Sequence, residues 1–366
     1  MGLRIIYGRA GCGKSHFCIE DIKKRWIENP ERTMILIVPE QFTLQAEKNL
    51  VKALGASGMG GPEVLSFRRL ARRVLDEVGG AARQHVNQAG KAMIIHSVLE
   101  KHRENFKAFG RSAGQKGFVN KLSGMFSEFK RYNVNPILLE ETTSKIDDRF
   151  LKDKLEDLSL IYSKYEEILH TRYIDTDDDL TLLSERMENS LNLGGAEIWM
   201  DEFSGFTPQE YEIIEKLLKI AYRVNVCLCT DCLVDMAKIQ DIDVFSPTKY
   251  TATRLMELGK NLNIQIEKPV ILNPDIPHRF KDSKALHHAE KFFFSFPYEI
   301  FKDKTESLRI LSAANPYSEV EAIAVELIKL CRDKKMRFKD IAVITTNLDD
   351  YEKLIRMIFP DRKSVV

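Results

Sequence analysis

The sequence predicts an α/β protein with an inserted block of helices, and three observations support this fold class. Short apolar, β-rich runs alternate with segments whose apolar residues recur at helical spacing, as in parallel sheets covered by helices. A glycine-rich segment joins the first such run directly to the first helical segment. Between residues 86 and 188 the β-rich runs disappear and helical spacing dominates. A chain of 366 residues is long enough for two or three domains with cores of their own.

Composition excludes several classes of protein. With 44% hydrophobic and 30% charged residues, the chain is neither disordered nor a membrane protein, and no apolar run reaches the roughly 18 residues that a membrane span needs. The N-terminus lacks the long apolar core of a signal peptide. Six cysteines are too few for a disulfide scaffold, so we expect a reduced, cytoplasmic setting. The net charge of +1 argues, at first, against nucleic acid as a partner.

The first candidate site follows the strand predicted at residues 3–7. The next eight residues fit the pattern G-x-x-x-x-G-K-[ST] without a mismatch, and a helical pattern follows them. In this context glycines let backbone N–H groups converge on phosphate oxygens, and the helix N-terminus adds a favourable dipole. We expect Lys14 to bridge the β- and γ-phosphates of ATP and the Ser15 hydroxyl to ligate Mg²⁺. The residues predicted to bind the nucleotide are Gly8, Arg9, Ala10, Gly11, Cys12, Gly13, Lys14 and Ser15.

A phosphate-binding loop of this kind needs an acidic partner on a neighbouring strand. The short apolar strand at 196–200 ends in Asp201 and Glu202, which makes them the candidates. Asp201 would hold the Mg²⁺ through its water shell, and Glu202 would polarise the attacking water as general base. The alternative, a solvated strand end, is weakened by the upstream loop and by the segment Phe203 to Gln209 that follows.

Further strands complete the first domain. Residues 34–38 read as a buried parallel strand closed by Pro39, and 63–67 as a third strand that runs into a basic helix at 68–78. Strands resume at Ile198 and again at 224–229. These runs predict one α/β domain made of residues 1–85 and 189–272, with an all-helical insertion at 86–188.

A second α/β unit is predicted beyond a linker. Residues 273–304 carry Pro274, Pro277 and Pro297 without strong periodicity, which is typical of a linker. Strands at 308–311 and 340–344 and helices at 319–331 and 351–358 then predict the beginning of a second domain, residues 305–360.

The order of these motifs resembles superfamily 1 helicases of the UvrD type, and specifically the AddB/RexB family. The segment Val38-Pro39-Glu40-Gln41-Phe42-Thr43 resembles that family's helicase motif Ia, and Val64 to Ala71 resembles its next motif. Asp201 to Gln209 resembles the family's Walker B segment. Asp340-Ile341-Ala342-Val343 with Tyr351 resembles the opening of a second motor domain.

The resemblance implies a fold and a function. It implies a P-loop, RecA-like helicase-type domain with the helical insertion, followed by the start of a second RecA-like domain. It further implies ATP and Mg²⁺ as ligands, an AddA subunit as heterodimer partner, and single-stranded and double-stranded DNA ends as substrates in recombinational repair. By the same resemblance, the nuclease domain and the iron–sulfur cluster would lie beyond residue 366. The DNA-facing residues it implies are Glu40, Gln41, Phe42, Thr43, Ser66, Phe67, Arg68 and Arg69.

Departures from active helicases bear on the mechanism. Only seven residues precede Gly8, so the adenine-reading glutamine of active relatives has no counterpart here. No glutamine follows the strand at 224–229, and Ile344-Thr345-Thr346-Asn347 stands where relatives carry an arginine. Because an arginine finger is worth about 10³–10⁵ in rate, we expect weak or lost motor activity. Two alternatives remain open: an autonomous ATP-hydrolysing helicase, and a non-catalytic DNA-scanning module with nucleotide as a folding cofactor.

Weaker signals have competing interpretations. Residues 101–135 hold eight Lys/Arg against two acids, with interleaved phenylalanines, so a DNA-facing surface competes with a helical core and the core is favoured. Cys227, Cys229 and Cys232 form C-x-C-x-x-C, which we interpret as part of a buried strand rather than a metal site. The aspartates at 175 and 177–179 could form a cation site, but a solvated helix start, with the acids complementing the helix dipole, is favoured. Residues 361–366 resemble nothing in the family, and we expect a non-native tail.

Overall fold

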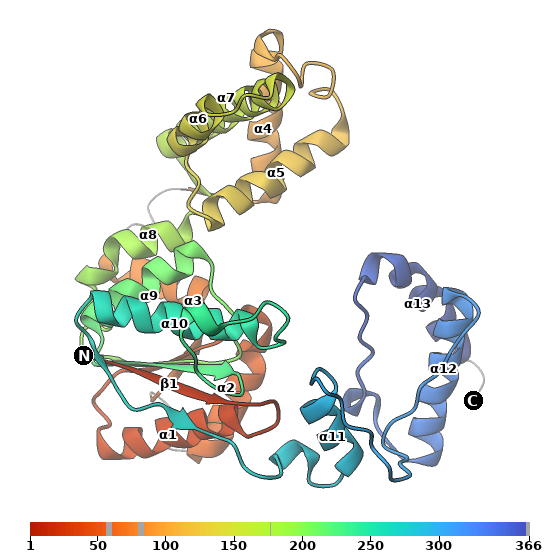
Figure 1. The fold of residues 1–366 in the computed structure, drawn as a ribbon. Helices are drawn as coiled ribbons and strands as arrows, with labels where there is room; N and C mark the ends of the chain where they lie inside the picture. Colours follow the sequence, from red (N-terminus) through yellow and green to blue (C-terminus); the bar gives the residue numbers. More distant parts are fainter. Residues whose placement is uncertain (56–60, 80–83, 176, 364–366) are drawn as a thin grey trace. The chain divides into compact units, whose positions relative to one another are not determined.

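The computed structural model describes residues 1–55, 61–79, 84–175 and 177–363. These residues form two compact units, Met1–Glu299 and Ile300–Val366, each described here by itself. The first unit contains a parallel sheet covered by helices, so the predicted α/β class is confirmed (Figure 1). None of the helices in the described parts of the chain combines the length and apolar character needed to cross a bilayer.

The sheet of the first unit has the strand order β3-β2-β6-β7-β1-β8, with β9 also paired to β1. All of these pairings are parallel. The strands are β1 (Gly2–Gly8), β2 (Met34–Ile37), β3 (Glu63–Leu65), β6 (Glu197–Met200), β7 (Arg223–Cys229), β8 (Gln265–Ile266) and β9 (Val270–Ile271). Sequence patterning predicts all but the last two, which are too short to carry a periodic signal.

Both faces of the sheet are buried, which explains why its strands are apolar throughout. Successive side chains of a strand point to opposite faces, so Ile5 and Ile6 enter different cores, as do Ile198 and Trp199. Figure 1 shows helices on both sides of the strands. One core includes residues of α1 (Lys14–Glu28) and α2 (Thr43–Leu54), and the other includes residues of α3 (Phe67–Val78), α8 (Asp179–Arg186), α9 (Pro208–Ile220) and α10 (Ser246–Asn261).

Local sequence fixes where α9 begins. The Thr207 side chain accepts a hydrogen bond from the Glu210 backbone N–H, and the Glu210 carboxylate accepts from the Thr207 backbone N–H. Pro208 occupies the first helical position, where a missing N–H costs nothing. The Phe-Thr-Pro segment that resembles the family motif is thus a capping box that orients the chain after β6.

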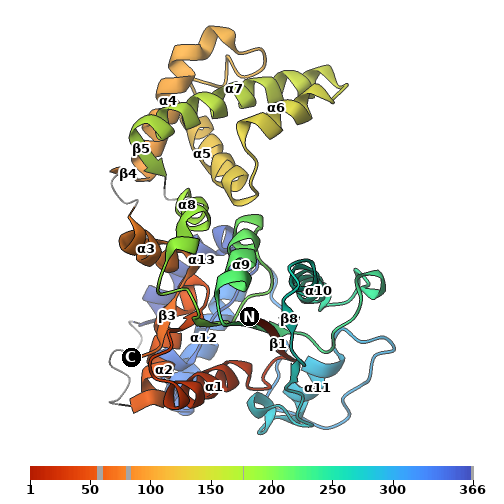
Figure 2. The ribbon, with the colours of Figure 1, turned by 90° about the vertical axis from the view of Figure 1, so that its left-hand side faces the viewer.

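The predicted insertion forms its own core, with different limits from those expected. It contains β4 (Gln84–Val86), α4 (Gln88–His102), α5 (Lys116–Arg131), α6 (Pro136–Ser144), α7 (Arg149–Arg172) and β5 (Tyr173–Asp175). It is not all-helical, because β4 and β5 pair in parallel at its base (Figure 2). Leu183 and Met187 pack in the core of the large sheet instead, so the part after Asp178 belongs with the α/β layers. The phenylalanines of residues 101–135 lie in or against the insertion's core, which confirms the core interpretation.

The second unit consists of α12 (Pro316–Asp333) packed against α13 (Leu348–Lys363). The strands predicted at 308–311 and 340–344 are not formed in the described residues, and Ile310 and Ile344 are each 91% exposed. A strand needs a neighbour to accept and donate its backbone hydrogen bonds, and in the described part of this unit neither segment has one. Of the predicted tail, residues 361–363 continue α13 and residues 364–366 lie outside the described residues.

Candidate nucleotide-binding site

The loop between β1 and α1 has a backbone that only glycine adopts without strain. Gly11 and Gly13 have φ angles of +78° and +88°, in the left-handed region. A Cβ atom added at Gly8 would lie 2.0 Å from the carbonyl oxygen of Leu272, next to β9. These glycines let the chain turn tightly from the strand into the N-terminus of α1.

The side chains predicted to bind the nucleotide and its metal line one pocket. Lys14 Nζ donates a hydrogen bond to the Arg9 carbonyl oxygen at 2.8 Å. The Ser15 hydroxyl donates to Glu202 Oε1 at 2.9 Å. Lys14, Ser15, Asp201 and Glu202 together line one pocket. The structure therefore brings together the cation, the hydroxyl and both carboxylates that sequence reasoning selected.

Sheet topology explains this meeting of residues that lie about 190 positions apart in the chain. Strand β7 pairs with both β1 and β6, all in parallel, so the carboxyl ends of the three strands lie at one edge of the sheet. Ligands of open α/β sheets bind at this edge. Asp201 follows β6 and is only 5% exposed, with its backbone N–H donating to the Ile37 carbonyl oxygen at 3.0 Å.

The backbone at Glu202 is strained. Its φ of +66° lies in the left-handed region, where a side chain other than glycine costs about 1–2 kcal/mol. This conformation turns the Glu202 carboxylate back toward Ser15.

This strain predicts an unusual order of stabilities. The substitutions Glu202→Gly and Glu202→Ala both remove the carboxylate, but only glycine relieves the strain. We expect the glycine variant to be more stable than the alanine variant by about 1 kcal/mol in chemical denaturation. At the exposed helical residue Glu20, the same pair should show the opposite order, because glycine weakens a helix. An alanine variant at 202 as stable as the glycine variant would contradict the prediction.

A segment that sequence reasoning assigned to the linker packs on this loop. The short helix η6 (His278–Phe280) contributes Arg279 to the pocket, and the Arg279 backbone N–H donates to the Gly11 carbonyl oxygen at 3.3 Å. Helix α11 (Lys284–Phe292) follows, so the interpretation of 273–304 as a loose linker is wrong for this part. No sequence signal identifies Arg279 as a residue of this pocket, because it is an isolated arginine in a segment with prolines and no periodic pattern.

Helix α11 also determines what Arg9 does. The Arg9 guanidinium donates to Glu290 Oε1 at 3.0 Å and to the Glu290 carbonyl oxygen at 2.7 Å. It also lies over the ring of Phe245, 5.1 Å from the ring centre. Arg9 therefore anchors α11 to the loop through its side chain, and only its carbonyl group faces Lys14.

Cysteines lie beneath the same pocket. Cys227 on β7 is buried, as the strand interpretation predicts, and Cys18 on α1 lies close to it. The pKa of the Cys227 thiol is raised well above its usual value. The side-chain contact with Cys18 is the largest cause, and burial is the second. The C-x-C-x-x-C motif does not form a ligand cluster in the described residues, because Cys227 groups with Cys18 and Asp201 rather than with its sequence neighbours.

A second cavity brings together the two segments that resemble DNA-facing motifs. Its lining includes Glu40 from η1 (Glu40–Phe42), Ser66 to Arg68 at the start of α3, and Phe203 after β6. We call this cavity the groove. The rings of Phe67 and Phe203 meet edge to face, with centroids 5.7 Å apart. Phe203 carries no sequence signal beyond its place after the two acids.

The residues predicted to contact DNA differ in their exposure to solvent. Thr43, Ser66 and Phe67 are at most 5% exposed, so their predicted role as DNA contacts is not supported. Ser66 caps α3 by accepting from the Arg69 backbone N–H, and Thr43 donates to the Glu40 carbonyl oxygen. The candidates that remain exposed are Glu40, Gln41, Phe42, Arg68 and Arg69. Both arginines have acidic partners, Asp177 at 3.7 Å from Arg68 and Glu47 at 3.2 Å from Arg69.

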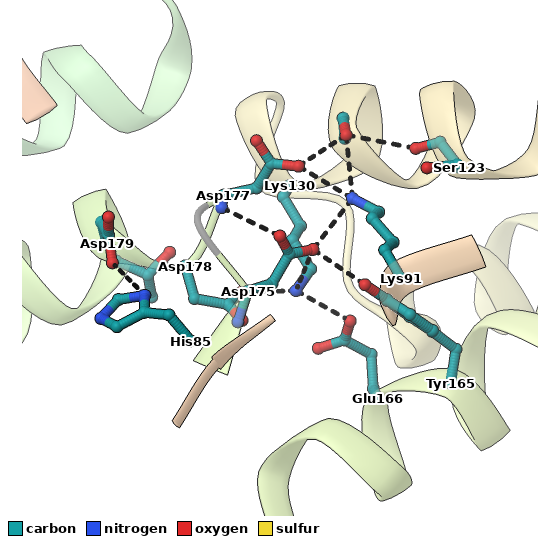
Figure 3. Close-up of polar contacts among 12 residues, drawn as sticks. His85, Lys91, Ser123, Lys130, Tyr165, Glu166, Asp175, Asp177, Asp178 and Asp179 are labelled. Atoms are coloured by element: carbon teal, nitrogen blue, oxygen red, sulfur yellow. Dashed lines mark hydrogen bonds and ion pairs between the residues drawn. The ribbon is translucent and has the colours of Figure 1, made fainter. Parts of the chain in front are cut away.

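Asp175, Asp177 and Asp178 belong to a buried charge network, shown in Figure 3, whereas Asp179 lies 3.8 Å from His85 Nδ1. Lys91 Nζ lies 2.9 Å from both Asp175 Oδ2 and Asp177 Oδ2, and Lys130 Nζ lies 2.6 Å from Asp178 Oδ1. Burial alone would raise the pKa of Asp175, but Lys130 and Lys91 hold it below its usual value. The prediction of a solvated helix start is wrong, because these acids join helices of the insertion to the segment before α8.

Comparison with known proteins identifies the family. Residues 5–290 match a family model described as "ADDB, N-terminal". This chain belongs to the AddB family.

Curated relatives of the AddB family agree with this assignment. The chain is 45% identical over 359 residues to a protein of Clostridium kluyveri, which covers 98% of this chain and 31% of that protein. It is 47% identical over 359 residues to one of Caldanaerobacter subterraneus, with the same coverage. It is 48% identical over 361 residues to one of Clostridium acetobutylicum, covering 99% of this chain and 31% of the relative. Each is named as one subunit of an ATP-dependent helicase/deoxyribonuclease, and the chain spans about a third of their length.

Proposed function

We propose that this chain is the nucleotide-binding and DNA-contacting region of an AddB-type subunit. It would act in the cytoplasm with an AddA subunit on single-stranded and double-stranded DNA ends. The observation that carries the nucleotide part is the meeting of Lys14, Ser15, Asp201 and Glu202 in one pocket at the carboxyl edge of the sheet. The AddB family membership and the relatives' names support the DNA part.

The residues have distinct roles in this proposal. The backbone N–H groups of the glycine loop and the N-terminus of α1 hold the phosphates, and Lys14 leaves the Arg9 carbonyl to bind the β- and γ-phosphate oxygens. Ser15 and Asp201 are hard oxygen donors that suit Mg²⁺, which would neutralise phosphate charge when bound. Glu202, released from Ser15, orients and deprotonates the attacking water.

Arg279 adds a charge that the sequence comparison with active helicases does not predict. Its side chain passes over Gly11, where a Cβ atom would lie 2.7 Å from the Arg279 Cβ. In our proposal the Arg279 guanidinium contacts the phosphates, because Arg279 lines the same pocket as Lys14 and Ser15. Among the described residues, segment 344–347 offers no arginine for this task.

The test compares binding with turnover. In the full-length subunit with its partner, Lys14→Ala should weaken nucleotide binding, and Glu202→Gln should leave binding intact while hydrolysis at this site falls at least 100-fold. If Lys14→Ala lowers binding but neither substitution changes hydrolysis by this site, nucleotide serves only as a folding cofactor and the non-catalytic alternative holds. Unaltered binding in Lys14→Ala would overturn the site itself.

The groove predicts a salt-dependent DNA contact. We expect Arg68→Ala to weaken single-stranded DNA binding and to reduce the slope of log affinity against log salt by about 0.7, the value for one lost phosphate contact. Fluorescence anisotropy across a salt series measures this. Arg149→Ala, at the exposed start of α7 and outside the groove, is the matched control and should leave the slope unchanged. An unchanged slope in the Arg68 variant would remove the groove from the DNA path.

A further inference from the structure

Three buried side chains with metal-binding atoms converge beneath the nucleotide pocket. The sulfur atoms of Cys18 and Cys227 and a carboxylate oxygen of Asp201 all lie within 4.8 Å of one another. Their exposed fractions are 1%, 2% and 5%, respectively. Sheet order produces this convergence: α1 follows β1, and β7 lies between β1 and β6. A pair of buried thiols beside a buried carboxylate is a donor set of a kind that binds metal.

We propose that Cys18, Cys227 and Asp201 form a site for a thiophilic divalent cation, with Zn²⁺ as the best-fitting ion. Tetrahedral Zn²⁺ binds thiolate at about 2.3 Å and carboxylate at about 2.0 Å, which brings the ligand atoms within about 4 Å of one another. Because the three ligand atoms already lie within 4.8 Å of one another, a contraction of at most about 1 Å brings them to this spacing. Binding converts each thiol to a thiolate and releases its proton to solvent, so each Zn²⁺ bound displaces two protons.

The donor set discriminates between cations. Mg²⁺ prefers octahedral oxygen ligands and binds sulfur poorly, whereas Zn²⁺ and its spectroscopic substitute Co²⁺ accept mixed sulfur and oxygen ligands. Cys227 and Asp201 also line the nucleotide pocket, which gives the ion an entry path and leaves a fourth coordination position open to water. The site is therefore a sulfur-lined position directly below the one that the proposed function assigns to Mg²⁺.

Sharing Asp201 couples the two sites. A Zn²⁺ ion held by the two thiolates also binds the Asp201 carboxylate, so this carboxylate is no longer available to Mg²⁺. Zn²⁺ therefore weakens the binding of Mg²⁺·ATP. This coupling rests on the proposed function, whereas the metal site does not.

Metal binding can be tested without nucleotide. Titration of the reduced chain with Co²⁺ should give thiolate-to-cobalt charge-transfer absorption that saturates at one ion per chain. Cys18→Ser and Cys227→Ser should each lose this absorption, and equilibrium dialysis should show Zn²⁺ affinity lowered at least tenfold. Cys331→Ser, a substitution in the second unit, is the matched control and should behave as wild type.

The wild-type titration keeps the test decisive even if a serine variant misfolds. Absence of charge-transfer absorption in the folded wild-type chain would overturn the proposal, as would absorption that survives in folded Cys18→Ser. Recovery of a Cys18–Cys227 disulfide instead of a metal complex under reducing conditions would also overturn it.

The coupling needs a second measurement. One equivalent of Zn²⁺ should weaken the binding of a fluorescent ATP analogue in Mg²⁺ at least tenfold in wild type but not in Cys18→Ser, whose altered side chain does not line the nucleotide pocket. If the cobalt absorption appears but nucleotide does not bind at all, the metal site stands and the proposed function fails. If nucleotide binds equally with and without Zn²⁺, the coupling is wrong.

Discussion

Replacing Lys14 with alanine should lower the affinity of this chain for ATP by about 10–100-fold. Each hydrogen bond between the Lys14 ammonium and a phosphate oxygen carries charge on both partners, and losing such a bond costs about 1.5–3 kcal/mol. In the structure this ammonium is held only 2.8 Å from the Arg9 carbonyl, inside the pocket that Ser15 and Asp201 also line. Equilibrium titration with a fluorescent ATP analogue measures the effect.

The matched control for this variant lies on the same helix. Lys24 is exposed on α1 and does not line the pocket, so Lys24→Ala should bind the nucleotide as wild type does. Circular dichroism should show both variants folded, because the Lys14 ammonium bonds within its own loop, to the Arg9 carbonyl oxygen. Equal loss of affinity in both variants would mean that general charge, rather than the position of Lys14, attracts the nucleotide.

Replacing Lys91 with methionine should destabilise the insertion by about 3–5 kcal/mol. The substitution keeps the length of the side chain but leaves Asp175 and Asp177 without the ammonium that lies 2.9 Å from each. Removing one partner of a buried ion pair is costly because the remaining charge keeps its desolvation penalty. Chemical denaturation followed by circular dichroism measures the loss. Lys101→Met, at an exposed position on the same helix, should change stability by less than about 0.5 kcal/mol.

The pH dependence of stability in wild type and in Lys91→Met tests the role of charge pairing. Burial would raise the pKa of both carboxyls, but Lys130 and Lys91 lower that of Asp175, and the Ser127 hydrogen bond together with Lys91 lowers that of Asp177. Their contribution to stability is therefore present above the ordinary carboxyl pKa near 4 and is lost as pH falls through the lowered values. The stability difference between wild type and Lys91→Met should narrow below about pH 4. A difference that stays constant down to pH 2 would show that packing, not charge pairing, accounts for the role of Lys91.

The network links two parts of the first unit that the sequence pattern separates. Lys91 and Lys130 come from α4 and α5 of the insertion, while Asp177 and Asp178 precede α8, which packs in the core of the large sheet. Asp177 also pairs with Arg68 in the groove at 3.7 Å. A DNA phosphate that binds Arg68 would compete with Asp177 for the guanidinium. Because Asp177 also pairs with Lys91, phosphate binding in the groove would alter the ion pairs at the base of the insertion.

Short-range signals explain which elements were predictable. The loop from Gly8 to Ser15 is recognisable because its glycines and its Lys-Ser pair fall within eight residues, and Gly11 and Gly13 provide the positive φ angles that the turn requires. The apolar strands are recognisable because both faces of the sheet are buried. The strands expected at 308–311 and 340–344 are not formed in the described residues, because a β-rich run becomes a strand only when another strand lies beside it, and neither segment has such a neighbour there.

The sequence by itself determined the α/β class and the family resemblance, and it selected Lys14, Ser15, Asp201 and Glu202, which line one pocket in the structure. Only the tertiary structure decided that Arg279 lies over the loop, that Thr43 and Ser66 are buried, and that Cys18 meets Cys227 beside Asp201. The physical reason is that a contact between distant segments depends on the order of strands in the sheet and on which face each side chain enters. Neither property leaves a pattern in neighbouring residues.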